Sequence, residues 1–322
     1  MKKPAYDIRR LRTDIYVREY KARVRTGEIV PETKLSALSP DDLTRMAYRH
    51  MGRAFAEENK ATDYLSLMEE WEWFCAGKHM YFPVPGLLEK ILDAKMEVDP
   101  DSLMFPEHPF ILAVPSEVGM RSVLVSRHSL DGRRTLATTF SEDIGIPVDL
   151  DIGIDGGWSL YLTELFEHKD TGAVEMLRFG CRKDHLTEVL NSNTAEQVMS
   201  LVGSLSEHDP DCLDLSSMEI DAQRKMLTIV CRLLVYMTTF PDAVRDGFPS
   251  REAEHLAGVR RKGRTLGERH FPKNGPKAHF RRWHFRSYPL RKDGSRKPGI
   301  VFVSESMVKG RGHVVLSDGN LE

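Results

Sequence analysis

The sequence predicts an α+β protein: an N-terminal helical region, a central antiparallel sheet, a second helical region, and a C-terminal basic loop and β-hairpin. Two observations support this prediction, one on the order of the regions and one on the size of the core. Apolar residues recur with a helical period in two separate stretches and with a period of two in the stretch between them. The length of 322 residues and the apolar fraction of 41% allow a substantial core. The expected regions are 1–38, 39–105, 106–182, 183–257 and 258–322.

The N-terminal part is expected to be helical after a basic arm. Residues 1–26 alternate charged with aromatic and aliphatic side chains, which favours either a helix or an arm that becomes ordered on a partner. The first firm helix begins after Ser39, because serine is a good N-cap and Pro40 suits the first helical position. The spacing of apolar residues predicts a helix over 62–75 and a short helix over 87–94.

The central region is expected to be a sheet, because its apolar residues alternate with polar ones. Turn signals such as Asp131-Gly132 separate the alternating segments. The regular spacing and short turns favour antiparallel pairing. The expected strands are 110–114, 121–127, 134–140, 147–154, 158–166 and 174–181.

Helices and a final pair of strands are expected after the sheet. Thr194 with Gln197 forms a capping box that opens one helix, and a very apolar helix runs from Ser216 until Pro241 stops it. Residues 258–277 are rich in Gly, Lys and Arg and poor in apolar residues, which indicates a mobile basic loop. The expected strands of the closing β-hairpin are 278–288 and 299–304.

The net charge of −2 conceals a strong asymmetry along the chain. Residues 1–26 carry +6 and residues 258–297 carry +12, whereas residues 27–257 carry −19 and residues 298–322 carry −1. Such a division favours a polyanion as the partner of the basic ends. It also favours a basic or apolar peptide as the partner of the acidic centre.

Several classes of protein are excluded by what the sequence lacks. No run of about 18 uncharged apolar residues is present, so we expect no membrane partner. The N-terminus leads into charged sequence rather than an apolar signal segment. The four cysteines are too widely spaced for a disulfide framework or a zinc ribbon, which favours a reducing cytoplasm.

No metal and no cofactor are expected. Asp149, Asp151 and Asp155 fit a strand with one solvated face better than a calcium loop, because Gly153 stands where an oxygen ligand is needed. The sequence also contains no Walker loop, no Rossmann fingerprint and no zinc-protease motif.

The strand expected over 278–288 carries the most informative side chains. One of its faces mixes Phe280, Arg282, His284, Arg286 and Tyr288, and such a mixture can pair with phosphates and stack on bases. Three readings stay open: anion binding, a structural strand that packs on the acidic centre, and RNA cleavage by one of two histidines. The candidate catalytic residues are His279 and His284. The candidate RNA- or ribosome-binding residues are Arg281, Arg282, His284, Arg286, Arg260, Arg261, Lys262 and Arg264.

A second candidate site lies in the acidic, aromatic end of the helix expected over 62–75. Glutamates surround two tryptophans there, which indicates either an amphipathic helix with Trp71 inside or a groove that binds a basic or apolar peptide. The candidate peptide-binding residues are Glu69, Glu70, Trp71, Trp73, His79 and Phe82.

Three short segments resemble one known family. Residues 78–83 read Lys-His-Met-Tyr-Phe-Pro and resemble its Lys-His-x-x-Phe-Pro element, which follows a tryptophan-bearing helix. Residues 246–251 read Asp-Gly-Phe-Pro-Ser-Arg and resemble its Gly-Leu-Pro-x-Ser-Arg element. Residues 279–285 read His-Phe-Arg-Arg-Trp-His-Phe and resemble its His-x-Arg-Arg-x-His-Trp element. The family is the type V-A anti-CRISPR group, which blocks biogenesis of the type V-A CRISPR effector nuclease.

The resemblance implies an inhibitor that is encoded on a plasmid or phage and acts in the cytoplasm of a bacterial host cell. It would recognise the N-terminal segment of the nascent nuclease during translation and trigger loss of the nuclease mRNA. Its partners would be that nascent polypeptide, the ribosome or the mRNA, and a host nuclease if the protein does not cut RNA itself. Two alternatives stay open: a nucleic-acid-binding regulator of a mobile element, and a ribonuclease that uses His279 or His284.

Overall fold

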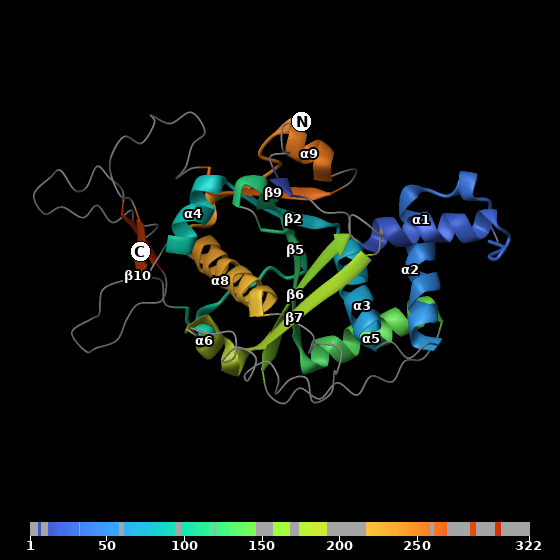
Figure 1. Ribbon diagram of the computed structural model, residues 1–322, viewed down its shortest axis with the longest axis horizontal. Helices are drawn as coiled ribbons and strands as arrows, with labels where there is room; N and C mark the ends of the chain where they lie inside the picture. The colour runs from blue at the N-terminus through green and yellow to red at the C-terminus, as the bar shows by residue number, and fades with distance from the viewer. Residues whose placement is uncertain are drawn as a thin grey trace, which may run out of the picture.

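The computed structural model of the protein is an α+β fold built on a central sheet with helices on both faces (Figure 1). The α+β class predicted from the sequence is thus confirmed. No helix within the described ranges is long and apolar enough to cross a membrane. The residues that the structure describes are 6–7, 12–31, 33–57, 61–93, 98–118, 120–145, 157–167, 174–191, 217–257, 261–268, 284–287 and 300–303.

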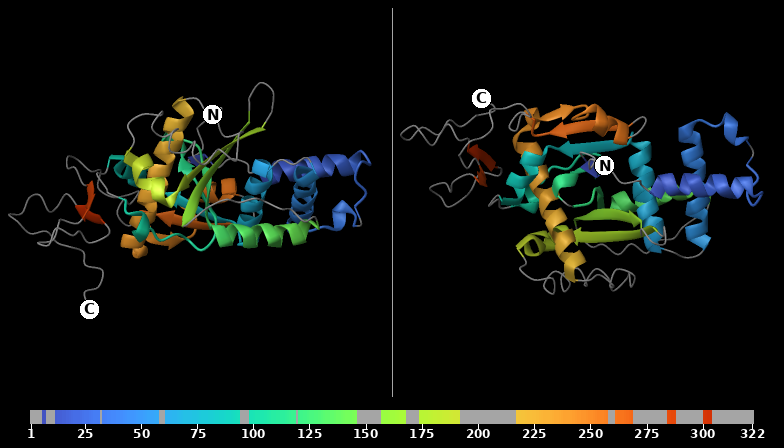
Figure 2. Two further views of the ribbon diagram at one scale, coloured as in Figure 1. Left: turned by 90° about the horizontal axis from the view of Figure 1, so that it is seen from below. Right: turned by 45° about the horizontal axis from the view of Figure 1, so that its top comes forward.

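Helices dominate the N-terminal part, as expected. The Ser39 hydroxyl accepts a hydrogen bond from the backbone amide of Asp42 at 3.2 Å, which confirms the predicted N-cap. Part of the basic arm is helical, and it packs at the end of the molecule that lies farthest from the C-terminal hairpin (Figures 1 and 2). The elements are β1 (Tyr6–Asp7), α1 (Arg12–Arg25), η1 (Leu35–Ala37), α2 (Pro40–Glu57) and α3 (Ala61–Cys75).

The central sheet has seven strands in the order β7-β6-β5-β3-β2-β9-β8. They come from four of the five regions expected from the sequence, so segments far apart in the chain share one sheet. The strands are β2 (His79–Pro83), β3 (Phe110–Leu112), β5 (Val123–Ser129), β6 (Trp158–Glu167), β7 (Val174–Arg182), β8 (Val244–Asp246) and β9 (Lys262–Leu266). A separate short strand, β4 (Val114–Pro115), pairs with β1.

The sheet is mixed. Its strands from 106–182, which are β3, β5, β6 and β7, pair antiparallel as predicted, but the sheet as a whole is not purely antiparallel. β2 runs parallel to both β3 and β9, while the other neighbouring strands are antiparallel. The connection from β2 to β3 contains helix α4 (Pro85–Asp93), and a crossover of this length permits parallel pairing where a short turn does not. Both parallel pairs involve β2, and neither β2 nor β9 was predicted as a strand, so only the antiparallel part of the sheet was expected.

The strand expected over 134–140 is also wrong, because this segment belongs to helix α5 (Leu130–Ile144). The Asp131-Gly132 pair opens the helix rather than a hairpin, since the Ser129 hydroxyl accepts a hydrogen bond from the Gly132 amide at 3.1 Å. Gly145 ends the helix with a φ of 73°, a left-handed cap that glycine adopts without strain. The buried side chains recur at helical spacing: Leu136, Ala137, Phe140 and Ile144.

Two hydrophobic cores lie on the two faces of the sheet. One core joins the sheet to α4, α6 (Lys183–Asn191) and α8 (Ser217–Thr239), and it contains Tyr81, Phe110 and Val125. The other joins the sheet to α2, α3, α5 and α9 (Arg251–Ala257), and it contains Met80 and Phe82. Figure 1 shows these two groups of helices on opposite sides of the strands. Successive residues of β2 therefore point alternately into the two cores.

The C-terminal hairpin is confirmed by the antiparallel pairing of β10 (His284–Ser287) with β11 (Ile300–Val303). The mobile loop expected over 258–277 is wrong at Lys262–Leu266, because these residues form β9 inside the sheet. The strand expected over 147–154 and the helix over 194–205 lie outside the described residues. Three further helical turns are η2 (Pro100–Ser102), η3 (Ser116–Val118) and η6 (Pro241–Ala243).

Candidate nucleic-acid interface

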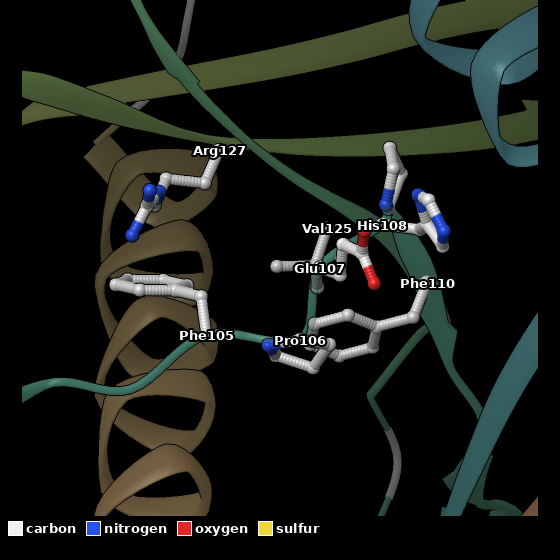
Figure 3. A pocket seen from close by; sticks show the side chains of 8 residues that line it. Phe105, Pro106, Glu107, His108, Phe110, Val125 and Arg127 are labelled. Atoms are coloured by element: carbon white, nitrogen blue, oxygen red, sulfur yellow. The ribbon is translucent and has the colours of Figure 1, made fainter.

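A cavity of about 240 Å³ opens where the segment before β3 crosses the end of β5. Figure 3 shows Arg127 and Phe105 on one side of it and Glu107, His108 and Phe110 on the other. The cavity combines aromatic rings with cationic or ionisable groups, and its volume suits a small planar or anionic group. Its lining is Phe105, Pro106, Glu107, His108, Pro109, Phe110, Val125 and Arg127.

Arg127 supplies a permanent positive charge to this cavity. It projects from β5, is exposed, and places its guanidinium carbon 5.1 Å from the centre of the Phe105 ring. Phe105 in turn meets Trp158 edge-to-face, with ring centroids 4.9 Å apart. Within the described ranges Arg127 forms no ion pair, so its charge is available to an incoming anion.

The first residues of β2 and β9 bring further basic side chains to the same region. The ring centroids of His79 and His108 are 6.2 Å apart. Parallel pairing sets His79 beside Lys262 and Tyr81 beside Arg264. We call His79, His108, Arg127, Lys262 and Arg264 the cationic cluster.

The two cations of β9 are positioned by their neighbours. The Arg264 guanidinium donates a hydrogen bond to the Tyr81 hydroxyl at 2.6 Å and lies 3.3 Å from the Asp246 carboxylate, which is almost fully exposed. The Lys262 side chain lies over Gly77, where an added Cβ would come within 2.9 Å of it. Gly77 has a φ of 101°, so the turn before β2 needs glycine both for its backbone conformation and for this close approach.

The charges of the cluster act on His79. Burial lowers the pKa of His79 below its usual value, and the neighbouring charges of Lys262, Arg264 and His108 lower it further. A hydrogen bond with the backbone of Ala76 opposes these effects in part. His79 is therefore mainly neutral near pH 7, in a place where positive charge accumulates. Such a place binds anions, because an anion relieves the repulsion between the cations.

The residues predicted to bind RNA meet different outcomes. Lys262 and Arg264 belong to the cationic cluster. Arg261 turns to the opposite face of the sheet, with its guanidinium carbon 5.6 Å from the Trp73 ring centre. His284 and Arg286 lie in β10, of which only the backbone is described. Four predicted residues lie outside the described residues: Arg260, His279, Arg281 and Arg282.

The predicted peptide-binding groove is not present at the surface in this structure. Five of its six residues are buried, the exception being His79, which is half-buried. The indole nitrogen of Trp73 donates a hydrogen bond to the His79 carbonyl at 2.8 Å. Helix α3 lies between the sheet and α2 and α5, so both glutamates and both tryptophans are enclosed. The buried residues are Glu69, Glu70, Trp71, Trp73 and Phe82.

Glu69 has a structural role that its sequence position did not reveal. Its carboxylate accepts a hydrogen bond from Arg178 of β7 at 2.6 Å and lies 3.7 Å from His128 of β5. The Arg178 guanidinium carbon also lies 3.9 Å from the centre of the Tyr161 ring. This buried polar group links α3 to the far strands of the sheet. It explains how an acidic residue is accommodated in the core.

Two of the three segments that carry the family resemblance meet in space. Residues 78–83 contain β2, and residues 246–251 connect β8 to α9. Phe82 of the first and Phe248 of the second pack edge-to-face, with ring centroids 5.4 Å apart. The third segment, 279–285, lies outside the described residues except for the backbone of its last two positions.

Sequence reasoning missed His108 and Arg127, and it placed His79 in a different site. No local pattern marks His108 or Arg127, because they meet at the cavity through the pairing of β3 with β5. In comparisons with known proteins, no protein-family model, no curated protein and no solved structure matches this chain.

Proposed function

We propose that this chain is an anti-CRISPR-like protein that acts on RNA during translation in the cytoplasm. It recognises the nascent N-terminal peptide of a type V-A CRISPR nuclease and triggers loss of the corresponding mRNA. The observation that carries the RNA-contacting part is the cationic cluster beside an aromatic cavity. The peptide-recognising part rests on the resemblance of the three short segments to the anti-CRISPR family.

The chemistry of the cavity suits single-stranded RNA. Arginine and lysine neutralise phosphates, and exposed aromatic faces stack on unpaired bases. Arg127 in the cavity wall, together with Lys262 and Arg264 on β9, offers the first kind of contact, and Phe105, which lines the cavity, offers the second. The volume of about 240 Å³ suits one base or one phosphate group rather than a large cofactor.

The structural observation that bears on the peptide-recognising part is a packing contact between two of the resembling segments. The two segments with described side chains, 78–83 and 246–251, form one contact across the sheet edge through Phe82 and Phe248. The surface that meets the peptide is not formed by Glu69, Glu70 or the two tryptophans, because these residues are buried.

A reporter assay in bacteria tests the proposal. The N-terminal coding segment of a type V-A nuclease is fused to a reporter, and the reporter mRNA is measured with and without this protein. We expect mRNA loss when the segment is translated in frame, and the same loss after synonymous recoding that keeps the peptide. A frame-shifted segment that keeps almost the whole RNA sequence is the matched control and is expected to show no loss.

The second candidate function is a nucleic-acid-binding regulator of a mobile element, which the same cationic cluster favours. The two candidates differ in what they recognise. If recoding abolishes the effect while the frame-shifted RNA still responds, RNA sequence is the signal and the regulator is correct. If neither the in-frame nor the recoded reporter loses its mRNA, the proposed peptide-directed function is wrong.

A further inference from the structure

We propose that His79 and His108, with Lys262 and Arg264, form an active site that cleaves RNA without a metal ion. The inference rests on the proposed function and names the agent of the mRNA loss, which would otherwise be a recruited host nuclease. It also differs from the sequence-based hypothesis, which placed catalysis at His279 or His284.

The placement of the two imidazoles is the first support. Their ring centroids are 6.2 Å apart, and they come from different elements, β2 and the segment before β3. Since a hydrogen bond joins heavy atoms about 3 Å apart, two rings at this separation can both reach oxygens of one phosphodiester. Neither histidine forms an ion pair within the described ranges that would occupy it.

The cations are the second support. Lys262 is paired in register with His79, is exposed, and forms no ion pair among the residues that the structure describes. Arg264 lies two residues further along β9, and its hydrogen bond to the Tyr81 hydroxyl fixes its direction. Two cations beside two imidazoles, one of them held by a hydrogen bond, stabilise the additional negative charge that a phosphate gains during displacement. Glu107, the one acid that lines the cavity in the described part of the chain, is exposed to solvent.

The chemistry balances without a co-reactant. Neutral His79 removes the proton from a ribose 2′-hydroxyl, and the 2′-oxygen attacks the adjacent phosphorus. The new bond joins this oxygen to phosphorus, while the bond from phosphorus to the 5′-oxygen of the next nucleotide breaks. Protonated His108 gives its proton to that 5′-oxygen. The products are a 2′,3′-cyclic phosphate and a free 5′-hydroxyl, and both histidines end in the opposite protonation state.

The assignment of base and acid follows from their surroundings. Burial, and then Lys262, Arg264 and His108, lower the pKa of His79, so this imidazole is neutral and ready to accept a proton near pH 7. His108 is exposed on the cavity wall, where it can reach the leaving 5′-oxygen, so it is assigned the role of the acid.

Purified protein and a short single-stranded RNA of mixed sequence test the inference. Cleavage is measured in excess EDTA, on free RNA and on mRNA held by translating ribosomes. Products are examined for the 2′,3′-cyclic phosphate. We expect cleavage in at least one setting, none of an all-deoxy oligonucleotide, and a loss of about 100-fold or more for H79A and for H108A. His108→Ala changes an exposed residue, so its loss of activity is not explained by unfolding.

His185→Ala is the matched control, because His185 lies on α6, away from the cluster, and its Nδ1 is 3.9 Å from the Glu188 carboxylate. This variant should cleave RNA at the wild-type rate. Intact RNA in both settings, or full activity of H108A, overturns the inference. The proposed function fails separately, through the recoded reporter. If reporter mRNA still disappears with H108A while the purified protein cuts no RNA, the proposed function stands but the active site is rejected. The mRNA is then cut by a recruited nuclease.

Discussion

Arg178 of β7 donates a hydrogen bond to the Glu69 carboxylate of α3 at 2.6 Å, although the two residues are 109 positions apart. Both side chains are buried, with 6% and 2% of their surfaces exposed. Charges removed from water in this way are tolerated only as a pair, because either one alone is strongly disfavoured in the core. The pair therefore ties the packing of α3 to the outermost strand of the sheet.

Replacing Arg178 by methionine should destabilise the protein strongly, because Glu69 then remains in the core without its partner. We expect the free energy of unfolding to fall by about 3–5 kcal/mol, measured by urea denaturation. Arg182→Met is the matched control on the same strand, since Arg182 pairs with Asp184, whose side chain is 52% exposed. It should lose about 1 kcal/mol or less. Equal losses for the two variants would contradict the structural role of the pair.

Glu72 should make stability depend on pH. Burial, and then the charge of Glu69, raise the pKa of Glu72 from 4.5 to about 7. The folded protein thus holds a proton at pH values where the unfolded chain has released it, so this group lowers the free energy of unfolding as the pH rises from about 4.5 to about 7. Glu72→Gln removes this effect and should stabilise the protein at pH 8 by about 1–3 kcal/mol relative to wild type.

The gain of Glu72→Gln should be small at pH 5, where the wild-type carboxyl is already protonated in the folded state. Thermal unfolding at both pH values measures the difference. Glu89→Gln, at an exposed position of α4, is the control and should show no comparable change between the two pH values. A gain for Glu72→Gln that is equal at pH 5 and pH 8 would sink this prediction.

Local signals in the sequence predicted the elements that depend on local physics. The N-cap at Ser39 and the stop at Pro241 mark helix ends that the structure confirms, because capping and proline geometry act within one turn. Helix α5 was missed because its threonines favour strands. In the structure their hydroxyls bond backbone carbonyls of the preceding turn, as in the 2.9 Å bond from Thr135 to Asp131.

The candidate site was predictable only in part, because it depends on contacts between distant segments. Arg264 and Tyr81 are 183 positions apart and meet through the parallel pairing of β2 with β9. Lys262 and Arg264 were recognised as basic, but neither their strand nor their proximity to His79 follows from composition. Conversely, the sequence suggested a surface groove at the acidic end of α3. The packing of α2 and α5 buries that end, and this packing is not visible in the local sequence.

The contact between Phe248 and Gly263 should be sensitive to one added methyl group. A Cβ on Gly263 would lie 2.7 Å from the Phe248 ring, which also packs on Phe82. Gly263→Ala must displace the ring, and we expect a loss of about 1–3 kcal/mol in urea denaturation. The double variant with Phe248→Leu should lose less than the sum of the two single losses, because the smaller side chain leaves room. Additive losses would contradict this account.

The titration of His79 should respond to Lys262. Burial is the main cause of the low pKa of His79, and the charges of Lys262, Arg264 and His108 follow, against a raising contribution from the Ala76 backbone. Lys262→Gln removes one of these charges, so the His79 pKa should rise towards the usual value. Nuclear magnetic resonance of the imidazole proton measures it directly. Inorganic phosphate should raise the pKa of His79 in the wild type and raise it less in the variant. An unchanged His79 pKa in Lys262→Gln would show that the charge of Lys262 does not act on His79.

The cationic cluster should govern the salt dependence of RNA binding. Each phosphate contact on single-stranded RNA contributes about 0.7 to the slope of log affinity against log salt concentration. Replacing Arg127 and Lys262 by glutamine should therefore weaken binding and reduce that slope by about 1.4, measured by fluorescence anisotropy over a range of salt. Arg134→Gln is the matched control, because Arg134 is exposed on α5, across the sheet from the cluster. A slope that falls equally for the control would assign the effect to net charge. An unchanged slope in the double variant would show that RNA does not bind this surface.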